Sequence, residues 1–343
     1  MSMRSELGEA PEVARALIEK QRGTIDAVAE AVRSRPVEMV LIAARGTSDH
    51  AAIYAQYVFG VHNKLPVALA APSIQSLYGV VPRLRHALVI GVSQSGQSPD
   101  VVGVIEEARR QNAPTIAVTN DAGSPLSLAA EFNIDIHAGP ERAVAATKTY
   151  VAELTALAML STALSDDPTA RRQLRDVPDA IAAALSLEEG VVSAAREQAG
   201  MQRAVVLGRG FNYSTALEWS LKLKEMTYVL ADAYSTADFE HGPIAMIDPG
   251  FVVHAIVASG PTLPEIEAVL GRLREAGARL VVASNAPEAL AYADIPLRLP
   301  ESPEWLSPLS AIIPGQLFAY HLALAKRLDP EHPRHIQKVT RTQ

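Results

Sequence analysis

The sequence of 343 residues contains no cysteine, and this absence excludes several kinds of chemistry at once. Disulfides, thiolate metal ligands, iron–sulfur clusters and cysteine nucleophiles all need that side chain. Aromatic residues are few, at 5% of the chain, and the 31 Lys and Arg residues are outnumbered by 38 Asp and Glu residues. The net charge of −7 argues against a protein that coats nucleic acid, because such a protein needs a basic face.

Long apolar stretches are also missing. No run approaches the roughly 18 uninterrupted apolar residues of a membrane span, and the first residues lack the apolar core of a signal peptide. We therefore expect a cytoplasmic protein with no membrane partner and no nucleic-acid partner. Apolar residues make up 48% and charged residues 20%, as in globular proteins. A chain of this length suits about two domains.

Short apolar runs alternate with helical patterns along the chain. Residues 11–33 have the apolar spacing of a helix, strand-like runs occupy 39–44, 86–92 and 115–120, and another helical pattern begins at Pro99. Strands that alternate with helices form a parallel sheet with helices on both faces. The sequence therefore predicts an α/β fold built on a doubly wound parallel sheet.

This pattern occurs twice. Residues 99–120 align with residues 264–285 at a constant offset of 165, and Arg45 matches Arg209 with a slip of one residue. A tandem duplication of one α/β unit explains a constant offset better than chance does. The predicted order is a helical arm, a first α/β domain, a helical linker, a second α/β domain and a tail, at residues 1–35, 36–165, 166–200, 201–325 and 326–343.

Hydroxyl-rich turns follow two strands of the first copy. One turn runs from Ser93 to Ser98 and the other from Gly46 to Ser48. Ser98 is placed to cap a helix that starts at Pro99, and the free amides of a helix N-terminus bind anions. Turn and capping chemistry alone is the alternative for each loop. In the second copy, residues 258–263 keep one serine of three, so we expect the anion site in the first copy only.

Charged residues share one face of a strongly helical segment, residues 216–225. Glu218, Lys222 and Glu225 are spaced by four and three residues. The spacing by itself fits an exposed ladder of ion pairs equally well. The segment follows an apolar run and a glycine turn equivalent to the first ligand loop, which favours a charged face turned toward a ligand.

A histidine and a basic tail complete the set of candidate residues. His241 lies in a Gly-Pro loop, where most histidines have no special role, although an imidazole suits acid–base work near neutral pH. Lys338 lies in a tail that solvent alone could explain. A lysine can also bind a sugar carbonyl, either as a Schiff base or as a cation beside the oxygen.

These segments together resemble the sugar isomerase (SIS) domain family, and the tandem copy resembles its double-SIS branch. That branch includes the isomerase half of glutamine–fructose-6-phosphate amidotransferase and the SIS-type glucosamine-6-phosphate deaminases. The resemblance covers residues from about 40 to 340. It is carried by Ala44–Ser48, Ser93–Ser98, Glu141–Lys148, Leu217–Glu225, Glu240–Pro243 and Pro333–Val339.

The resemblance implies a binding site for a sugar phosphate in the first copy. The residues implied to hold the phosphate are Thr47, Ser93, Gln94, Ser95 and Ser98, with Gly46 beside them, and those implied to line the sugar are Ser48, Val144 and Ala146. The synthase usually has Cys where Arg45 stands and Ser where Ala146 stands. The forms of the first two loops look more like the deaminase.

The resemblance also implies the catalytic roles. Glu225 is the base that moves a proton between C1 and C2, His241 assists opening of the sugar ring, and Lys338 contacts or condenses with the carbonyl. Glu218 and Lys222 support the site. In this family the histidine loop is donated by the other subunit, so we expect a homodimer in which His241 completes the neighbouring site. Glu240 replaces the lysine that is common beside this histidine in the synthase.

The expected function is an enzyme that deaminates glucosamine 6-phosphate to fructose 6-phosphate and ammonia. The alternatives are a synthase-like or simple phosphosugar isomerase, a deglycase for glycated amino acids, and a non-catalytic sugar-phosphate sensor. We expect neither a glutaminase domain with its cysteine nucleophile nor a DNA-binding segment before residue 40. No nucleotide-binding glycine motif and no metal-ligand spacing is present, so we expect no cofactor and no metal.

Overall fold

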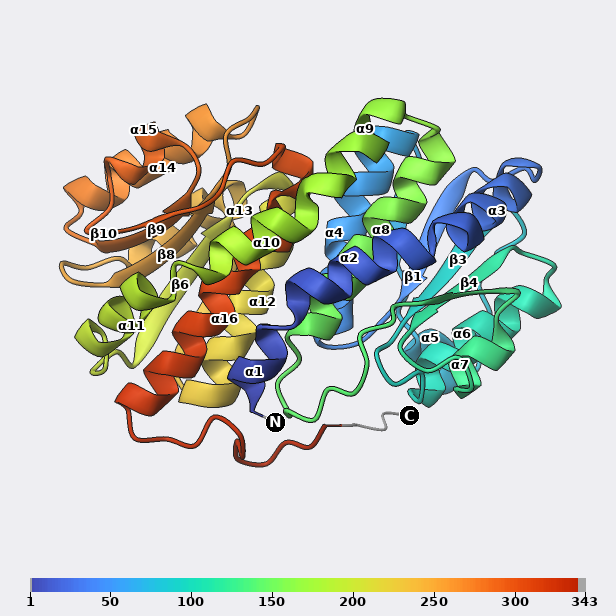
Figure 1. Cartoon of the computed structure of the whole chain (residues 1–343), viewed down its shortest axis with the longest axis horizontal. Coiled ribbons are helices and arrows are strands. Elements are labelled where there is room, and N and C mark those ends of the chain that lie inside the picture. Colours follow the sequence, from blue (N-terminus) through green and yellow to red (C-terminus); the bar gives the residue numbers. More distant parts are fainter. Residues whose placement is uncertain (1, 339–343) are drawn as a thin grey trace. The chain divides into compact units, whose positions relative to one another are not determined.

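The computed structural model describes residues 2–338 and contains two compact α/β units (Figure 1). The N-terminal unit comprises Glu9–Arg142, Ala146–Asp176 and the tail from Ile336. The C-terminal unit comprises Val177–His335 together with residues up to Gly8 and Ala143–Ala145.

A parallel sheet of five strands forms the centre of the N-terminal unit, in the order β2-β1-β3-β4-β5. The strands are β1 (Met39–Ala43), β2 (Val67–Leu69), β3 (Ala87–Val92), β4 (Thr115–Thr119) and β5 (Phe132–Asp135). Every residue of β3 is buried, as expected for a central strand that is covered on both faces. The doubly wound parallel sheet predicted for this copy is confirmed.

Helices cover both faces of this sheet. The helices are α2 (Ala10–Lys20), α3 (Arg22–Arg33), α4 (Thr47–Asn63), α5 (Ser73–Ser76), α6 (Pro99–Arg110), α7 (Pro125–Ala129), α8 (Lys148–Ser165), α9 (Pro168–Gln173) and the 3₁₀ turn η1 (Leu174–Asp176). A core of aliphatic side chains joins α6 and α7 to one face of β3 and β4. The long helices α4 and α8 pack against each other and against the sheet.

The C-terminal unit repeats this architecture with the strand order β7-β6-β8-β9-β10. Its strands are β6 (Arg203–Gly208), β7 (Leu230–Ser235), β8 (Val252–Val257), β9 (Arg279–Ser284) and β10 (Ile295–Arg298). Strand β8 lies 165 residues after β3, which is the offset found in the sequence. The predicted duplication is therefore confirmed.

The helices of the C-terminal unit follow the same plan. They are α1 (Met3–Leu7), α10 (Val177–Leu185), α11 (Glu188–Glu197), α12 (Tyr213–Thr227), α13 (Thr236–Glu240), α14 (Leu263–Glu275), α15 (Pro287–Leu290) and α16 (Ser307–Ala325), with the 3₁₀ turns η2 (Gly210–Asn212), η3 (Pro243–Met246) and η4 (Glu304–Leu306). Helices α12 and α16 pack together, and α12 also packs on β6 and β7. Within residues 2–338, Glu304–Ala325 is long and apolar enough to cross a membrane, but 78% of its apolar window is buried, as in a core helix.

The structure differs from the sequence-based expectation in two segments. Residues 11–33 form two helices instead of one, because the chain bends at Gln21, whose side chain lies 2.7 Å from the ring of His137. The predicted N-terminal arm is also divided, since α1 belongs to the C-terminal unit whereas α2 and α3 belong to the N-terminal unit. The predicted linker is helical, and the division between the units falls inside it, after Asp176.

Candidate active site

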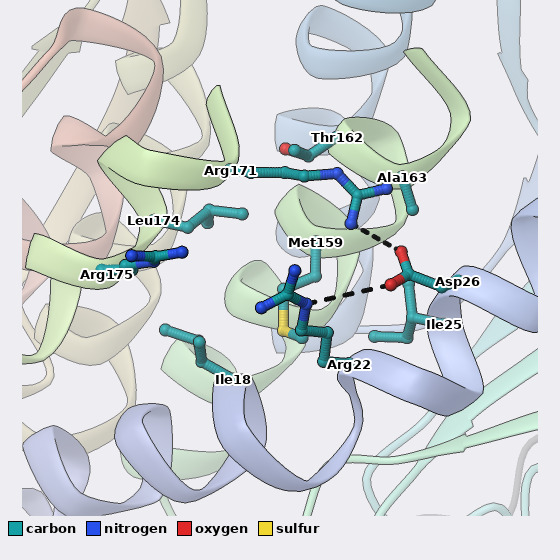
Figure 2. Close-up of a pocket in the computed structure, with 10 residues that line it drawn as sticks. All are labelled: Ile18, Arg22, Ile25, Asp26, Met159, Thr162, Ala163, Arg171, Leu174 and Arg175. Atoms are coloured by element: carbon teal, nitrogen blue, oxygen red, sulfur yellow. Dashed lines mark hydrogen bonds and ion pairs between the residues drawn. The ribbon is translucent and has the colours of Figure 1, made fainter. Parts of the chain in front are cut away.

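A pocket among helices of the N-terminal unit contains none of the predicted site residues (Figure 2). It is lined by Ile18, Arg22, Ile25, Asp26, Met159, Thr162, Ala163, Arg171, Leu174 and Arg175. Arg171 donates to the Asp26 carboxylate over 2.7 Å, so the charges in this pocket already pair in part. The predicted residues lie instead in the segments after β1, β3 and β5, on α12, at the end of α13 and in the tail.

The loop from Ser93 to Ser98 follows β3 and is fixed by its own backbone. The Gln94 carbonyl accepts a hydrogen bond from the Asn120 amide at 3.1 Å, and the Gly96 carbonyl accepts one from the Leu126 amide at 3.1 Å. These bonds tie the loop to the chain that follows β4. Its hydroxyls are therefore held at the carboxyl edge of the sheet, where α/β proteins bind ligands.

Glycine is required at position 96 for two reasons. Its φ of +60° lies in the left-handed region, and a Cβ atom there would come within 2.1 Å of the Ser124 hydroxyl. The tight turn lets the Gly96 amide donate to the Ser93 carbonyl and to the Ser93 hydroxyl, at 3.1 and 3.2 Å. The Ser93 hydroxyl accepts this bond and keeps its own proton to donate.

Helix α6 begins directly after this loop, as predicted. Ser98 occupies the N-cap position in an extended conformation, but its side chain makes no capping hydrogen bond. The expectation that this hydroxyl caps the helix is therefore wrong. Its hydroxyl is therefore not used to cap α6. The Ser95 hydroxyl accepts only a long bond, at 3.4 Å from the Gln97 amide.

An ion pair between Arg45 and Asp100, called the arginine clasp, joins the two hydroxyl-rich loops of the N-terminal unit. Arg45, which follows β1, holds the Asp100 carboxylate through Nε at 2.8 Å and through Nη2 at 2.7 Å. The Asp100 side chain has no exposed surface and lies in the first turn of α6. Without Arg45 its negative charge would oppose an anion at that helix end. Sequence reasoning missed this pair, because the two residues are far apart in the chain.

The turn after β1 positions a second pair of hydroxyl groups. Gly46 has a φ of +56° and precedes α4, and Thr47 is the first residue of that helix. Ser48 is buried and donates its proton to the Glu153 carboxylate at 2.8 Å. Because that proton is used, Ser48 can only accept from a further ligand group. Glu153 had no assigned role in the sequence.

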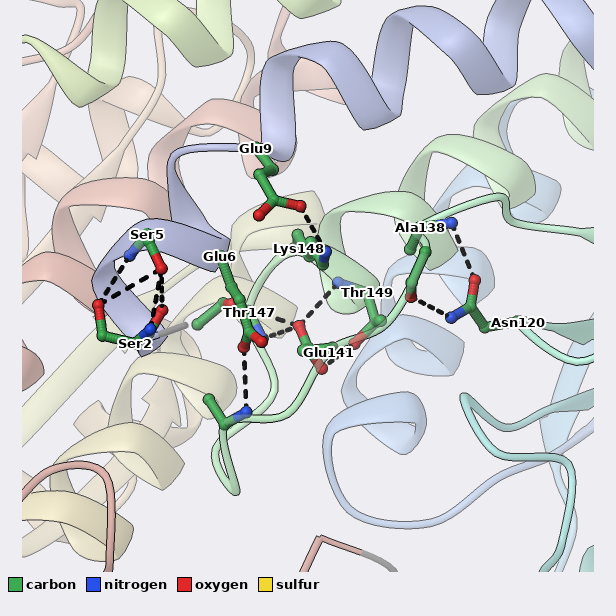
Figure 3. Close-up of polar contacts among 12 residues, drawn as sticks. Ser2, Ser5, Glu6, Glu9, Asn120, Ala138, Glu141, Thr147, Lys148 and Thr149 are labelled. Carbon is green, nitrogen blue, oxygen red and sulfur yellow. Dashed lines mark hydrogen bonds and ion pairs between the residues drawn. The ribbon is translucent and has the colours of Figure 1, made fainter.

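The segment after β5 centres on a buried carboxylate, that of Glu141 (Figure 3). Glu141 accepts hydrogen bonds from Thr147 and Thr149, which begin α8. It also accepts one from the Lys338 ammonium at 2.6 Å, so Lys338 reaches the same segment. Val144 and Ala146 are both half-buried here, but Val144 belongs to the C-terminal unit and Ala146 to the N-terminal unit.

Three charged side chains of α12 form a buried cluster in the C-terminal unit. Lys222 and Glu218 have no exposed side-chain surface, and the Lys222 Nζ and Glu218 Oε1 atoms lie 3.1 Å apart. Lys222 Nζ also lies 2.7 Å from Glu225 Oε2, and the Glu225 side chain keeps 22% of its surface exposed. The alternative of an exposed ladder is wrong, because tertiary packing covers two of the three residues.

The cluster fixes the charge of its lysine. Burial alone would lower the pKa of Lys222, but the carboxylates of Glu218 and Glu225 raise that pKa above its ordinary value. Lys222 is thus a permanent cation between two carboxylates. Of the three residues only Glu225 reaches the surface, so it is the member that can exchange a proton with a ligand.

The position of this cluster along the helix differs from the expectation. Glu225 lies about 18 Å from the start of α12, at 1.5 Å of rise per residue. Helix α12 joins two parallel strands and runs against them, so Glu225 is at the end away from the turn after β6. The turn after β6 therefore does not itself position Glu225, and the orientation of the charged face toward a ligand stays a prediction.

His241 ends α13 and is exposed. Within residues 2–338 its ring has no hydrogen-bond partner. Its backbone amide donates to the Asp238 carbonyl at 3.1 Å. The neighbouring Glu240 forms an ion pair with Arg272. That carboxylate is neutralised from the side of α14. The described chain contains no cluster of three or more His, Asp or Glu residues able to hold a metal ion.

Comparison with known proteins gives the family. A model of the SIS domain matches two segments of the chain, residues 35–163 and 199–326. The chain belongs to the SIS domain family. The family and the tandem α/β fold predicted from the sequence are confirmed.

Two relatives of this SIS protein carry the name glutamine–fructose-6-phosphate aminotransferase [isomerizing]. The one from Thermococcus kodakarensis is 32% identical over 98% of this chain and 57% of its own length. The one from Methanothermobacter thermautotrophicus is 37% identical over 88% of this chain and 51% of its own length. The chain therefore spans about half the length of these curated relatives.

Solved structures resemble this SIS protein over most of the chain. A "putative phosphosugar isomerase" from Silicibacter pomeroyi DSS-3 is 33% identical, with a TM-score of 0.86 and coverage of 96% of this chain and 100% of that chain. The C-terminal domain of glucosamine-fructose-6-phosphate aminotransferase from Francisella tularensis is 26% identical, with a TM-score of 0.88 and coverage of 96% and 98%. A Thermotoga maritima glucosamine-6-phosphate deaminase, at 21% identity and a TM-score of 0.74 over 96% and 100%, shares the fold. These solved structures therefore share the fold of this chain over nearly its whole length.

Proposed function

We propose that this SIS protein catalyses aldose–ketose isomerisation of an amino-sugar phosphate, and that its reaction is deamination of glucosamine 6-phosphate to fructose 6-phosphate and ammonia. The observation that carries the proposal is the buried cluster on α12. A permanent cation holds two carboxylates, and Glu225 alone reaches the surface. A partly exposed carboxylate held in one orientation is what a proton shuttle between adjacent carbons requires.

In this proposal the N-terminal unit holds the phosphate. Four residues of the loop after β3 would donate to it, with Thr47 and Gly46 from the loop after β1; the four are Ser93, Gln94, Ser95 and Ser98. The unused capping capacity of Ser98 and the neutralised Asp100 support this role. A phosphate distant from the reacting carbons orients the substrate and leaves the chemistry to other groups.

The proposed chemistry moves a proton between adjacent carbons. The Glu225 carboxylate takes the proton from C2 of the open-chain amino aldose while the C1 oxygen gains a proton, which gives an enolamine. Glu225 then returns its proton to C1 while the amine nitrogen gives up one proton, so that C1 becomes CH2OH and C2 becomes an imine carbon. Water adds to the C2 imine, the proton of the new C2 hydroxyl passes to nitrogen, and the C2–N bond breaks to leave the C2 ketone and ammonia. Lys338 would donate to the oxygen on which charge develops, Glu218 and Lys222 would hold Glu225, and Ser48, Val144 and Ala146 would line the sugar.

His241 has a proposed role in a second subunit. Its ring is exposed and makes no hydrogen bond within the described chain, so it is available to a neighbouring copy. We place it as the group that assists ring opening in the site of that copy, which makes the active protein a homodimer. Light scattering on the active protein tests this, since an active monomer would contradict it.

Two directions of the reaction are considered, and they differ in the fate of the nitrogen. These 343 residues contain no cysteine, so they hold no thiolate that could hydrolyse glutamine. In the first candidate, deamination, ammonia is released as a product. The second candidate is synthesis of the amino sugar, which is favoured by the names of the two curated relatives.

One assay separates these candidates. Purified protein is given a panel of amino-sugar phosphates, and ammonia and fructose 6-phosphate are measured by coupled enzymes. We expect equal release of both products from glucosamine 6-phosphate. Formation of the amino sugar from fructose 6-phosphate and ammonium, without measurable release, would favour synthesis. Binding of sugar phosphates without turnover or exchange of the C2 proton would identify a sensor and contradict the proposal.

A further inference from the structure

The carboxylate of Glu141 in the N-terminal unit accepts several hydrogen bonds, one of them from the tail of the chain. The Glu141 side chain is completely buried. Its Oε1 atom accepts bonds from the Thr147 amide at 2.9 Å and from the Thr149 amide at 3.2 Å. Its Oε2 atom accepts the Thr149 hydroxyl at 2.7 Å and the Lys338 ammonium at 2.6 Å. Figure 3 shows how the threonines converge on it.

The two carboxylate oxygens of Glu141 have different partners. Oε1 accepts hydrogen bonds from backbone amides at the start of α8 and so links that helix to the segment that follows β5. Oε2 is the atom that meets Lys338, which comes from the opposite end of the chain. Linking α8 to that segment needs only the first set of contacts. The contact with Lys338 is additional, and it fixes a residue that follows four exposed positions, residues 334–337.

The electrostatics of the pair favour two full charges. Burial alone would raise the pKa of Glu141, but the Lys338 charge and the hydrogen bonds from Lys338, Thr147 and Thr149 lower it below its usual value. Glu141 is therefore a buried anion, and a buried anion is costly unless a cation meets it. Lys338 is the cation that does so.

We propose that Glu141 is a positioning residue for Lys338, holding its ammonium as a fixed cation at the substrate carbonyl. This rests on the proposed function, in which Lys338 acts on that oxygen. An ammonium has three donors, and one of them goes to Glu141. The Lys338 side chain keeps 21% of its surface exposed, so its other donors can reach a ligand. Without the carboxylate, the long side chain would lose this single orientation.

The test is a double-mutant cycle on kcat and KM with glucosamine 6-phosphate. Glu141→Gln keeps the size and an acceptor oxygen for the threonines but removes the charge. We expect it to lower kcat by about 10-fold to 100-fold, as a misplaced catalytic group does, with little change in KM. In a Lys338→Met background the same change should cost almost nothing further, because Glu141 acts through the ammonium.

The matched control is Thr149→Val, which removes the hydroxyl bond to Oε2 but leaves Lys338 in place. We expect its kcat to stay within about threefold of the wild type. An equal loss from Glu141→Gln in both backgrounds would show a merely structural role and overturn the proposal. Should Glu141→Gln fold poorly in a thermal melt, Glu141→Asp replaces it, and we expect that variant to keep part of the rate because the charge remains.

A second measurement needs no turnover. Acylation of Lys338 by an amine reagent is followed by mass spectrometry in the wild type, Glu141→Gln and Thr149→Val. We expect faster labelling in Glu141→Gln alone, because only there does the ammonium lose its carboxylate. Unchanged labelling would overturn the positioning role. If the Glu141→Gln variant is labelled faster but the wild-type protein has no isomerase or deaminase activity, the proposed function is contradicted. The ion pair between Glu141 and Lys338 would still be supported.

Discussion

The two copies of the α/β unit differ most at the loop where the first would hold a phosphate. In the N-terminal copy, residues 93–98 carry three serine hydroxyls, and that of Ser98 makes no capping bond to α6. In the C-terminal copy, residues 258–263 already meet a carboxylate of the chain itself. Thr262 donates to Glu304 at 2.6 Å, and a Cβ atom on Gly260 would come within 2.3 Å of Glu304 Oε2. The same strand-to-helix turn can thus face a ligand or an internal anion.

The copies agree in the clasp behind that loop. Arg45 holds Asp100 in the first, and Arg209 lies 3.1 Å from Glu265 in the second, at matching places. The clasp therefore belongs to the duplicated unit, whereas the hydroxyl donors belong to one copy. The burial differs, because Asp100 has no exposed side-chain surface and Glu265 keeps 44%.

The largest effect expected concerns the division of labour between the copies. Glu225→Gln removes the proton acceptor from the C-terminal unit but leaves the loops of the N-terminal unit intact. General-base action contributes about 10²–10⁴-fold in rate, so we expect a loss of that size in kcat with sugar-phosphate affinity little changed. Exchange of the C2 proton with solvent, followed by NMR, measures the step directly.

The control for that variant lies about two helical turns away, on the same helix face. Glu218→Gln removes the other carboxylate on Lys222, and we expect a smaller loss because the Glu218 side chain has no exposed surface. If Glu225→Gln exchanges the C2 proton at the wild-type rate, the charged cluster on α12 has a purely structural role.

The next effect concerns phosphate. Ser98→Ala and Ser95→Ala each remove a donor to a charged group, which contributes about 1.5–3 kcal/mol, so we expect affinity for inorganic phosphate to fall by about 10-fold to 100-fold. The control is the one serine of the corresponding loop in the second copy, and Ser259→Ala should leave the affinity unchanged. Equilibrium dialysis measures both, and the reverse ranking would move the site to the C-terminal unit.

A smaller effect is expected from the clasps. Arg45→Ala leaves the buried Asp100 without its cation, and we expect a loss of about 1–3 kcal/mol in the free energy of unfolding. Arg209→Ala should cost less than about 1 kcal/mol, because Glu265 is partly in water. Urea unfolding compares the two variants. Equal losses would show that burial does not distinguish the clasps.

The smallest effect is a dependence of stability on pH in the second copy. His254 on β8 is fully buried between Trp219 and Phe318, and burial lowers its pKa from 6.5 to about 3. Below pH 6.5, His254 binds a proton in the unfolded chain but stays neutral in the folded chain. The free energy of unfolding therefore falls as the pH falls toward 3. We expect a loss of about 1 kcal/mol over the first pH unit below 6.5.

The first copy supplies the variant for this test, since Val89 stands at the position that corresponds to His254. His254→Val should remove this contribution to the acid-side slope, whatever its effect on stability at neutral pH. Denaturant unfolding at several pH values measures the slope. An unchanged slope in His254→Val would assign the dependence to other groups.

Much of the fold could be predicted because it depends on local patterns. The sequence predicts buried apolar runs such as residues 87–92, and it predicts that α6 begins at Pro99. The constant offset of 165 identified the repeat. The break between α2 and α3 at Gln21 could not be predicted from the sequence, because a tertiary contact with His137 accompanies it. For the same reason the sequence included Glu141 in a motif without showing what it holds, and it gave Glu153 no role. Val339 of the expected tail motif lies outside the described residues.

The sequence by itself determined the family, the duplication and the residue types available for chemistry, because these depend on the order of residues and on composition. Only the tertiary structure decided which charges are buried. Glu218 and Glu225 look equivalent in the sequence, since both lie on one helical face with Lys222. Packing covers Glu218 and leaves Glu225 at the surface. The free energy of a charge depends on its surroundings, and those surroundings come from chain segments far apart in the sequence.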